Sequence, residues 1–372
     1  MNERKHSALR GQISVIVVAM VAVATTLVVE TGIAEAADDD IHWTAHARWG
    51  VEYDDNPHRL ESEDGENAIG SGDSLLRYLL GGDIVSDVGD SGQVSATLQH
   101  GGTVFRQETD ANAVLTEVSG AGLWRPGKQF SLQLRADVKD RSESGDHRRD
   151  YTRGSLALRG GRSIGPVQLR ADGGWRFLAY KPSPPSSHRG PFVGAGARWL
   201  VRNDLALDAS WTHSWRDYTM TAWEVRDDQF VSIGEPRADD HDLWRVVARY
   251  QRHINASLRY QYAKNRSNSH GQQMARHGVE ASVTVPVMWD VFLSARGEIQ
   301  RTRYEDPVLF DDVMLLDEDH RNTLVAAVNR QIAGPWDLEF RYSLFTQEFG
   351  VGGEYRRQTV ALAIRAYFDE GE

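Results

Sequence analysis

The chain has 372 residues, contains no cysteine, and carries a formal net charge of −11 at pH 7. The lack of cysteine excludes disulfides, thiolate metal sites and a cysteine nucleophile. The negative charge argues against nucleic acid as a partner, because nucleic-acid binding depends on cations that neutralise phosphates.

The N-terminal segment has the three parts of a secretory signal peptide. Cationic residues precede the apolar run 13–29, and an Ala-Glu-Ala sequence that ends at Ala36 provides a cleavage site. We therefore predict a signal peptide over 1–36 and a single mature domain over 37–372, with an uncleaved membrane anchor as the alternative. Further along, no stretch approaches the roughly 20 apolar residues that a spanning helix needs. Such an exported chain is periplasmic, secreted or an outer-membrane barrel.

Apolar and polar side chains alternate through most of the mature chain. In 129–141, for example, Leu132 and Leu134 alternate with Gln133 and Arg135. A period of two predicts a β-strand with one apolar and one polar face. About sixteen such segments of roughly 9–13 residues follow one another, and tilted strands that cross a bilayer have this length. Further clear cases, in chain order, are 43–53, 167–179, 205–215, 336–346 and 358–368.

The connections between these segments alternate in length. Seven are short and rich in Gly, Pro, Asn and Asp, which supply tight-turn geometry, and eight are longer or more polar. Outer-membrane barrels have this asymmetry, with short periplasmic turns and long extracellular loops, whereas a soluble sandwich has no reason for it. The short connections are 87–92, 125–128, 162–166, 201–204, 252–255, 286–290 and 332–335, and the longer ones are 54–73, 106–112, 142–149, 180–190, 216–240, 265–271, 305–319 and 348–354.

Aromatic side chains concentrate at the ends of the predicted strands. Amphipathic rings settle at the two membrane interfaces of a barrel, so this placement predicts two aromatic belts, and scattered core tryptophans are the alternative. We assign Trp43, Trp124, Trp199, Trp289 and Trp336 to the short-turn interface, and Trp49, Trp175, Trp215, Trp244 and Tyr304 to the long-loop interface.

The mature chain resembles a bacterial outer-membrane β-barrel of porin size. Residues 359–368 look like the closing strand of such a barrel, which ends on an aromatic residue, here Phe368, another ring expected at the interface. The resemblance implies an all-β, antiparallel up-and-down barrel of about 16 strands in the outer membrane of a Gram-negative bacterium. It also implies contact with outer-membrane lipid and lipopolysaccharide, assembly by the barrel assembly machinery, and the option of a homo-oligomer. The first strand, 48–57, is similar to openings of barrels in surface-protein or exopolysaccharide export systems.

The polar faces of the predicted strands carry more cations than carboxylates. An Arg or Lys that faces lipid at mid-membrane costs about 2–4 kcal/mol, so this face is expected to line a wet lumen. Rings of permanently charged Arg are a device of anion-selective pores. The alternative is that Arg–Asp and Arg–Glu pairs brace the wall, and the two roles are compatible. The lumen candidates are Arg48, Arg135, Asp137, Arg170, Asp172, Arg176, Arg245, Arg249, Arg259, Arg296 and Arg341. Alternation also places Arg77, Arg365, Glu52, Asp208, Glu280, Glu298 and Glu339 on this face.

The longest predicted loop, 216–240, is unusually apolar for a loop. Its Tyr218, Trp223 and Phe230 suggest that it either folds into the mouth as a constriction or extends as a hairpin above it. The loops 54–73 and 305–319 are acidic. They either bind divalent cations that bridge to lipopolysaccharide or form a solvated surface, and the acid spacing does not match a Ca²⁺-binding loop.

These features predict a channel for passive diffusion of small polar or anionic solutes. A barrel subunit of a polysaccharide or surface-protein export system, and a structural barrel without a through-path, are the alternatives. We expect no enzymatic activity, no cofactor and no metal site. His241 between Asp240 and Asp242 could form a catalytic acid–His pair on the rim, but no nucleophile motif or paired-His spacing accompanies it.

Overall fold

The computed structural model describes residues 41–57, 72–145, 147, 149–181, 186–227, 229–306, 321–347 and 356–369. The predicted signal peptide lies outside these residues. Among the described residues, no helix is long and apolar enough to span a membrane.

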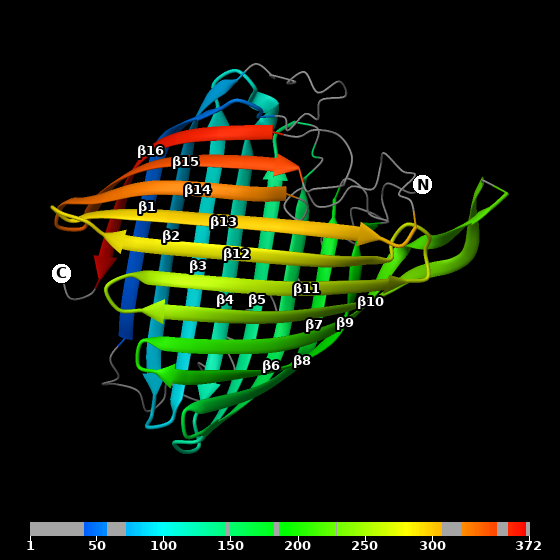
Figure 1. Ribbon diagram of the computed structural model, residues 1–372, viewed down its shortest axis with the longest axis horizontal. Coiled ribbons are helices and arrows are strands. Elements are labelled where there is room, and N and C mark those ends of the chain that lie inside the picture. Colours follow the sequence, from blue (N-terminus) through cyan, green and yellow to red (C-terminus); the bar gives the residue numbers. More distant parts are fainter. Residues whose placement is uncertain are drawn as a thin grey trace.

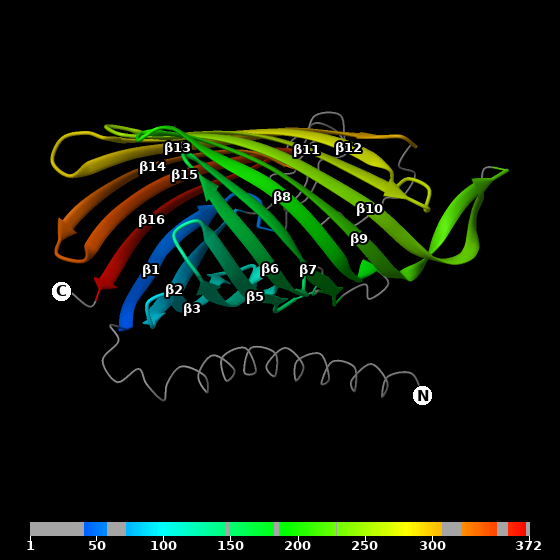
Figure 2. The same cartoon turned by 90° about the horizontal axis from the view of Figure 1, so that it is seen from below.

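Sixteen strands form one closed barrel (Figures 1 and 2). Each strand pairs antiparallel with its neighbours in sequence, and β1 closes the ring by pairing with β16, from Thr44 opposite Asp369 to Asp54 opposite Thr359. This confirms the predicted up-and-down meander. The strands are β1 Ile41–Asp54, β2 Asp73–Val88, β3 Gly92–Phe105, β4 Ala113–Trp124, β5 Phe130–Glu143, β6 Tyr151–Ile164, β7 Val167–Tyr180, β8 His188–Arg202, β9 Leu205–Arg226, β10 Gln229–Gln251, β11 Asn255–Ser267, β12 Met274–Pro286, β13 Val291–Tyr304, β14 Arg321–Ala333, β15 Trp336–Gln347 and β16 Arg356–Asp369, with one 3₁₀ turn at Thr109–Ala111.

The seven predicted short connections all join consecutive strands at one end of the barrel. Several contain a glycine in the left-handed region, as Gly89, Gly165 and Gly334 show. Tight turns between antiparallel strands often need this conformation, which glycine adopts without strain. The positions of the turn residues therefore predict correctly which strands are joined by short turns.

The segment 216–240 takes the hairpin arrangement, one of the two predicted for it, but it is not a loop. Residues 216–240 are mostly strand, because β9 and β10 continue past their neighbours and pair as far as Arg226 opposite Gln229, with register shifts around Pro236. The two strands form a hairpin that projects beyond the barrel wall (Figure 1). A hairpin outside the membrane is wet on both faces, so its sequence lacks the one-sided alternation by which the other strands were recognised.

Apolar side chains lie on the outside of the barrel and charged ones lie inside. Leu98, Leu134, Leu158, Ile299 and Leu362 are all well exposed, whereas the buried residues include many carboxylates. A water-soluble protein has the opposite arrangement, since it buries apolar surface. The outer face is therefore suited to lipid and the inner face to water.

The predicted interface tryptophans are exposed side chains, as is Phe368. Their division into two belts is wrong for one pair, because the rings of Trp49 and Trp336 lie in edge contact with centroids 5.7 Å apart. Barrel closure staggers the strands. Trp336, the first residue of β15, is opposite Ala366 of β16, and Ala366 is in turn opposite Ala47, in the middle of β1. Tyr304, in turn, occupies an inner-face position on β13, in register with Met274.

A pair of adjacent substitutions tests the two faces. Leu98 lies on the outer face of β3 and is 52% exposed, so Leu98→Arg should place a cation in the hydrocarbon and lower the free energy of unfolding by about 2–4 kcal/mol. Gln99→Arg adds the same side chain to the inner face and should fold normally. Urea unfolding in lipid vesicles and heat-modifiable gel migration measure both, and greater damage from Gln99→Arg than from Leu98→Arg would mean that the faces are reversed.

Candidate functional site: the charged inner wall

The charged side chains of the inner wall gather where the barrel closes. We define the seam cluster as Arg48 and Glu52 of β1, Arg77 of β2, Glu339 and Arg341 of β15, and Arg365 of β16. These residues alternate along their strands with outward apolar ones, such as Trp49 and Val51, so they share the inner face. The register of four neighbouring strands thus brings four cations and two carboxylates together.

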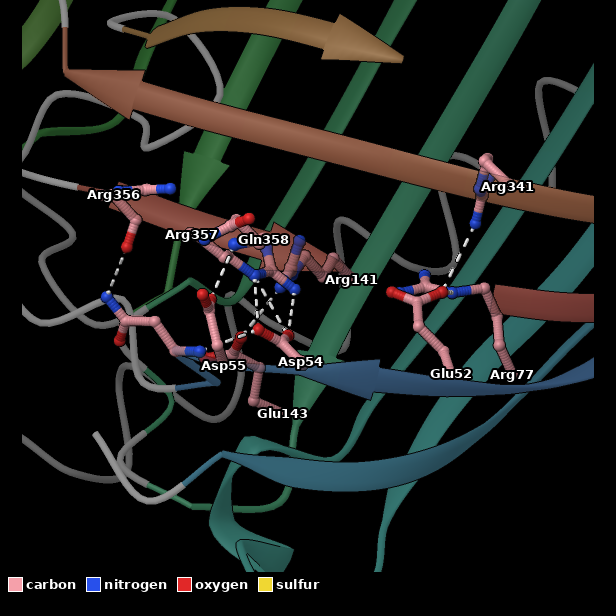
Figure 3. Close-up of polar contacts among 11 residues, drawn as sticks. Glu52, Asp54, Asp55, Arg77, Arg141, Glu143, Arg341, Arg356, Arg357 and Gln358 are labelled. Carbon is pink, nitrogen blue, oxygen red and sulfur yellow. Dashed lines mark hydrogen bonds and ion pairs between the residues drawn. The ribbon is translucent and has the colours of Figure 1, made fainter. Parts of the chain in front are cut away.

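Each carboxylate of the seam cluster has more than one arginine partner. Glu52 accepts hydrogen bonds from Arg77 at 2.9 and 3.0 Å and from Arg341 at 3.3 Å, as Figure 3 shows. Glu339 accepts one from Arg48 at 2.6 Å and also pairs with Arg365. The Arg48 and Glu339 pair reaches across the intervening strand β16. Close charge-assisted bonds of this kind tie the two ends of the sheet together on their concave side.

The cations of the seam cluster shield its carboxylates from the lumen. The Glu52 and Glu339 side chains are only 2% and 1% exposed, whereas their arginine partners are 15–33% exposed. With four guanidiniums and two carboxylates, the formal charge of the cluster is +2. A solute in the lumen therefore meets guanidinium groups, and the negative charge lies underneath them.

A second cluster on β9–β13 repeats this arrangement. Glu280 accepts a hydrogen bond from Arg259 at 2.7 Å and another from Arg296 at 3.1 Å. Asp208 pairs with Arg249. Glu280 and Asp208 are again nearly buried, and their arginines are 36–54% exposed. Two parts of the wall thus present cations over carboxylates.

Three of the predicted lumen arginines lack a carboxylate partner among the described residues: Arg170, Arg176 and Arg245. The Arg170 guanidinium covers Gly196 on β8, where an added Cβ would lie 2.7 Å from its Nε. The Arg176 guanidinium lies over the Phe192 ring, with its carbon 4.2 Å from the centroid. These cations add positive charge to the wall without a direct ion pair among the described residues.

The remaining sequence-predicted lumen residues make loose pairs on β5–β7. Arg135 and Asp137 are 4.0 Å apart and both stay accessible. Asp137 accepts a hydrogen bond from Ser155 at 2.7 Å. Asp172 lies 3.9 Å from Arg159, which the sequence candidates did not include. Arg135 therefore keeps most of its charge available to the lumen.

Sequence reasoning did not single out Arg77, Arg365, Glu52 or Glu339 as site residues. Alternation places them on the inner face, but only the pairing of β1 with β16 brings them together. No local signal in the sequence carries that pairing. The closeness of the two chain ends in an up-and-down barrel is the one clue that could have pointed to them.

The three candidates for a constriction loop lie on the β9–β10 hairpin and around its base. Tyr218 stacks under Arg237, whose guanidinium carbon is 4.0 Å from the ring centroid. The backbone of Trp223 bonds to Ser269 and His270, and the Phe230 ring is 5.9 Å from that of His270. Of the two arrangements predicted for this segment, the structure has the hairpin.

The base of the hairpin is held by charge. Asp239 accepts hydrogen bonds from Arg237, at 3.0 Å from Nε, and from Asn265 at 2.9 Å. Burial alone would raise the pKa of the Asp239 carboxyl, but these hydrogen bonds outweigh it and hold the pKa below its usual value. The carboxylate stays ionised and fastens β10 to β11.

The sequence Asp240-His241-Asp242 lies within β10 and does not form an acid–His pair of neighbours. Successive strand residues point to opposite faces, so His241 lies on the inner face and the two aspartates on the outer face. Asp242 instead accepts hydrogen bonds from His213 at 2.9 Å and from Trp211 at 3.1 Å on the neighbouring strand. In the described part of the chain, no group of three or more His, Asp or Glu side chains could hold a metal ion.

Comparison with solved structures places this barrel among the porins by fold. The chain is similar to an anion-selective porin from Comamonas acidovorans, with a TM-score of 0.52, 11% identity, and coverage of 89% of this chain and 100% of that one. It is also similar to OmpT of Vibrio cholerae, with a TM-score of 0.47, 11% identity, and coverage of 90% and 99%. No protein-family model and no curated protein matches the chain. Its fold is that of the sixteen-strand porin-like barrels.

Removal of one carboxylate tests the seam cluster. Glu339→Gln leaves Arg48 and Arg365 without their carboxylate partner, so the free energy of unfolding should fall by about 2 kcal/mol. The loss is smaller than for a fully buried ion pair, because the two arginines are partly exposed to water. Glu117→Gln removes an exposed partner 3.8 Å from Lys139 and should cost less than about 1 kcal/mol. Urea titration of folded protein in vesicles compares the two, and equal losses would contradict the bracing role of Glu339.

Proposed function

We propose that the protein is a channel in the outer membrane of a Gram-negative bacterium, through which small polar or anionic solutes diffuse passively. The observation that carries this proposal is the charge arrangement of the inner wall. Guanidinium groups face the lumen, and their carboxylate partners lie beneath them. Fixed cations on the wall of a narrow water-filled pore attract anions and repel cations.

The outer face supports the membrane location. A closed barrel has no free strand edge, so every strand can satisfy its backbone hydrogen bonds without water. Its outer side chains are largely apolar and exposed, which is costly in water and favourable in hydrocarbon. These two properties together fit a bilayer better than any aqueous compartment.

The size of the barrel supports a passage. Side chains alone fill a barrel of about eight strands, whereas barrels of sixteen strands enclose an aqueous channel. Charged side chains on the inner wall also need water as a solvent, because an ion in a dry interior costs several kcal/mol. A wet lumen through which solutes diffuse satisfies both requirements.

The proposed channel also self-associates. OmpT of Vibrio cholerae, an outer membrane protein to which this chain is similar with a TM-score of 0.44, has a trimer form. The mass of the folded protein in mild detergent measures this directly. A monomer would remove self-association from the proposal and leave the channel intact.

Planar-bilayer recording under a salt gradient tests the channel. We expect stepwise conductance and a reversal potential that shows preference for chloride over potassium. The double variant R170Q/R245Q removes two cations that have no carboxylate partner among the described residues, so the barrel should still fold while the anion preference falls by about twofold. Its matched control, R162Q/R330Q, removes two outer-face arginines near the short turns and should leave selectivity unchanged.

The outcomes separate the competing functions. Absence of conductance would refute the channel and favour a sealed structural barrel. Conductance with cation preference would refute the cationic lumen. A very large conductance that ignores the charge of the solute would favour a subunit of an export system.

A further inference from the structure

The outer wall carries a patch of cations that the lumen does not use. We define the outer-wall patch as Lys264 and Arg266 of β11, His277 of β12, and Arg301 and Arg303 of β13. The register runs from Tyr262 through His277 to Arg301 across three strands. Two residues further along, it runs from Lys264 through Ala275 to Arg303. The patch is therefore continuous over neighbouring strands.

The side chains of the patch point away from the lumen. Two residues nearer the middle of each strand than Tyr262, His277 and Arg301, the same register joins Tyr260, Val279 and Ile299. These three are among the exposed apolar residues of the outer face. Residues two apart on a strand share a face. The inner face of the same strands carries Arg259, Glu280 and Arg296 instead.

Most of the charge of the patch is not neutralised. Lys264, Arg301 and Arg303 have no ion pair or hydrogen bond from their side chains to any residue that the structure describes. Arg266 lies 3.0 Å from Asp242, an acid already bonded to Trp211 and His213.

Other acids border the patch on two sides. Asp240 lies beside Asp242 on the outer face of β10, and Glu305 follows Arg303 at the end of β13. Four Lys and Arg side chains against Asp240, Asp242 and Glu305 leave a formal charge of +1 on this part of the outer wall. Lys264 and Arg266 are opposite Asp242 and Asp240 in the register, so the cations farthest from the aspartates are Arg301 and Arg303 on β13.

The patch lies at the loop ends of β11, β12 and β13, where the wall of a membrane barrel approaches the headgroups. An outward arginine at mid-membrane costs about 2–4 kcal/mol, and the cost falls to about 0–1 kcal/mol near the interface. On the outer face of β13, Arg301 and Arg303 are the next two residues after the exposed Ile299. They lie at the loop end of the strand, so their long side chains can reach the headgroups. The rings of Trp244 and Tyr262, with centroids 5.5 Å apart, lie beside the patch at the same end of the wall.

Other strands end differently. On β1, the last outward residues before the loop are Val51 and Tyr53, and on β3 the last one is Val104, all three of them exposed. The loop ends of β1 and β3 are therefore apolar on the outside, whereas those of β11 and β13 together carry four cations. On β16, Arg356 is a single outward cation at the loop end.

We propose that the outer-wall patch binds the phosphate groups of a phosphorylated lipid in the outer leaflet, whose acyl chains lie along Ile299 and Val279. Guanidinium groups match phosphate oxygens in a bidentate geometry, and Lys264 adds a third cation beside them. The exposed His277, whose Nδ1 is 2.8 Å from the Tyr260 hydroxyl, offers a further polar contact. This proposal rests on the membrane location given under Proposed function, but not on conductance.

Native mass spectrometry of the folded protein, purified from membranes in mild detergent, tests this proposal. The probes are lipid A with two phosphates, lipid A with one phosphate, and phosphatidylcholine. We expect retention in the order of phosphate number. In R301Q/R303Q, retention of the two-phosphate probe should fall by about tenfold or more, since each cation near an anionic lipid is worth about 1 kcal/mol.

The matched control is R162Q/R330Q, which removes the same charge from the same face at the short-turn end and should retain lipid like the parent. Equal retention by R301Q/R303Q and the parent, or no dependence on phosphate number, would overturn the proposal. So would dissociation of an oligomer in R301Q/R303Q, since it would assign the patch to a second copy of this chain.

Conductance recorded on the same samples keeps the two proposals apart. Both double variants should conduct as the parent does. Lipid retention without conductance would refute the channel alone, and conductance without phosphate-dependent retention would refute the lipid site alone. Gel migration before and after heating shows whether each variant has folded.

Discussion

Hydrocarbon offers no hydrogen-bond partner to a peptide group, so the backbone of a membrane strand must be satisfied within the protein. Here that requirement is met by the pairing of β1 with β16, which leaves no strand edge open. Closing sixteen strands into a ring fixes their tilt and stagger. The stagger then decides which side chains meet, and it brings Trp49 to Trp336 on the outside and Arg48 to Glu339 on the inside.

The two faces of the sheet contact different solvents, hydrocarbon outside and water inside. Outside, apolar side chains replace the charged surface of a soluble protein, and the outward Lys and Arg residues that the structure describes lie towards the strand ends. Inside, carboxylates such as Glu52 and Glu339 take positions that a soluble protein would give to leucine, and arginines cover them. The same ion pairs serve structure and electrostatics, because the acid anchors the arginine and the surplus arginine charge faces the water. Bracing and selectivity are thus two results of one arrangement.

Local patterns predicted what local physics determines. Alternation in 129–141 and the turn residues at 87–92 and 332–335 gave the strands and their order, because strand faces and tight turns depend on neighbours in sequence. The hairpin at 216–240 was one of two predicted arrangements, but the continuous strand pairing within it was not predicted, since both of its faces are wet. The stagger that joins Trp49 to Trp336, and the partners of Glu339, depend on ring closure between residues far apart in sequence. Arg301 and Arg303 have no ion-pair partner among the described residues, and nothing in the sequence distinguishes them from other arginines near a strand end.

The seam cluster also has a consequence for the order in which the barrel forms. Arg48 and Glu339 are 291 positions apart, and Glu52 and Arg341 are 289 apart. Contacts of such long range come late, because the chain entropy lost in closing a large loop is repaid only after the intervening hairpins exist. The seam therefore contributes nothing to early folding and stabilises only the finished ring. A nascent chain that stops before β16 can form every hairpin up to that point and still lack the charge network that holds the two ends together.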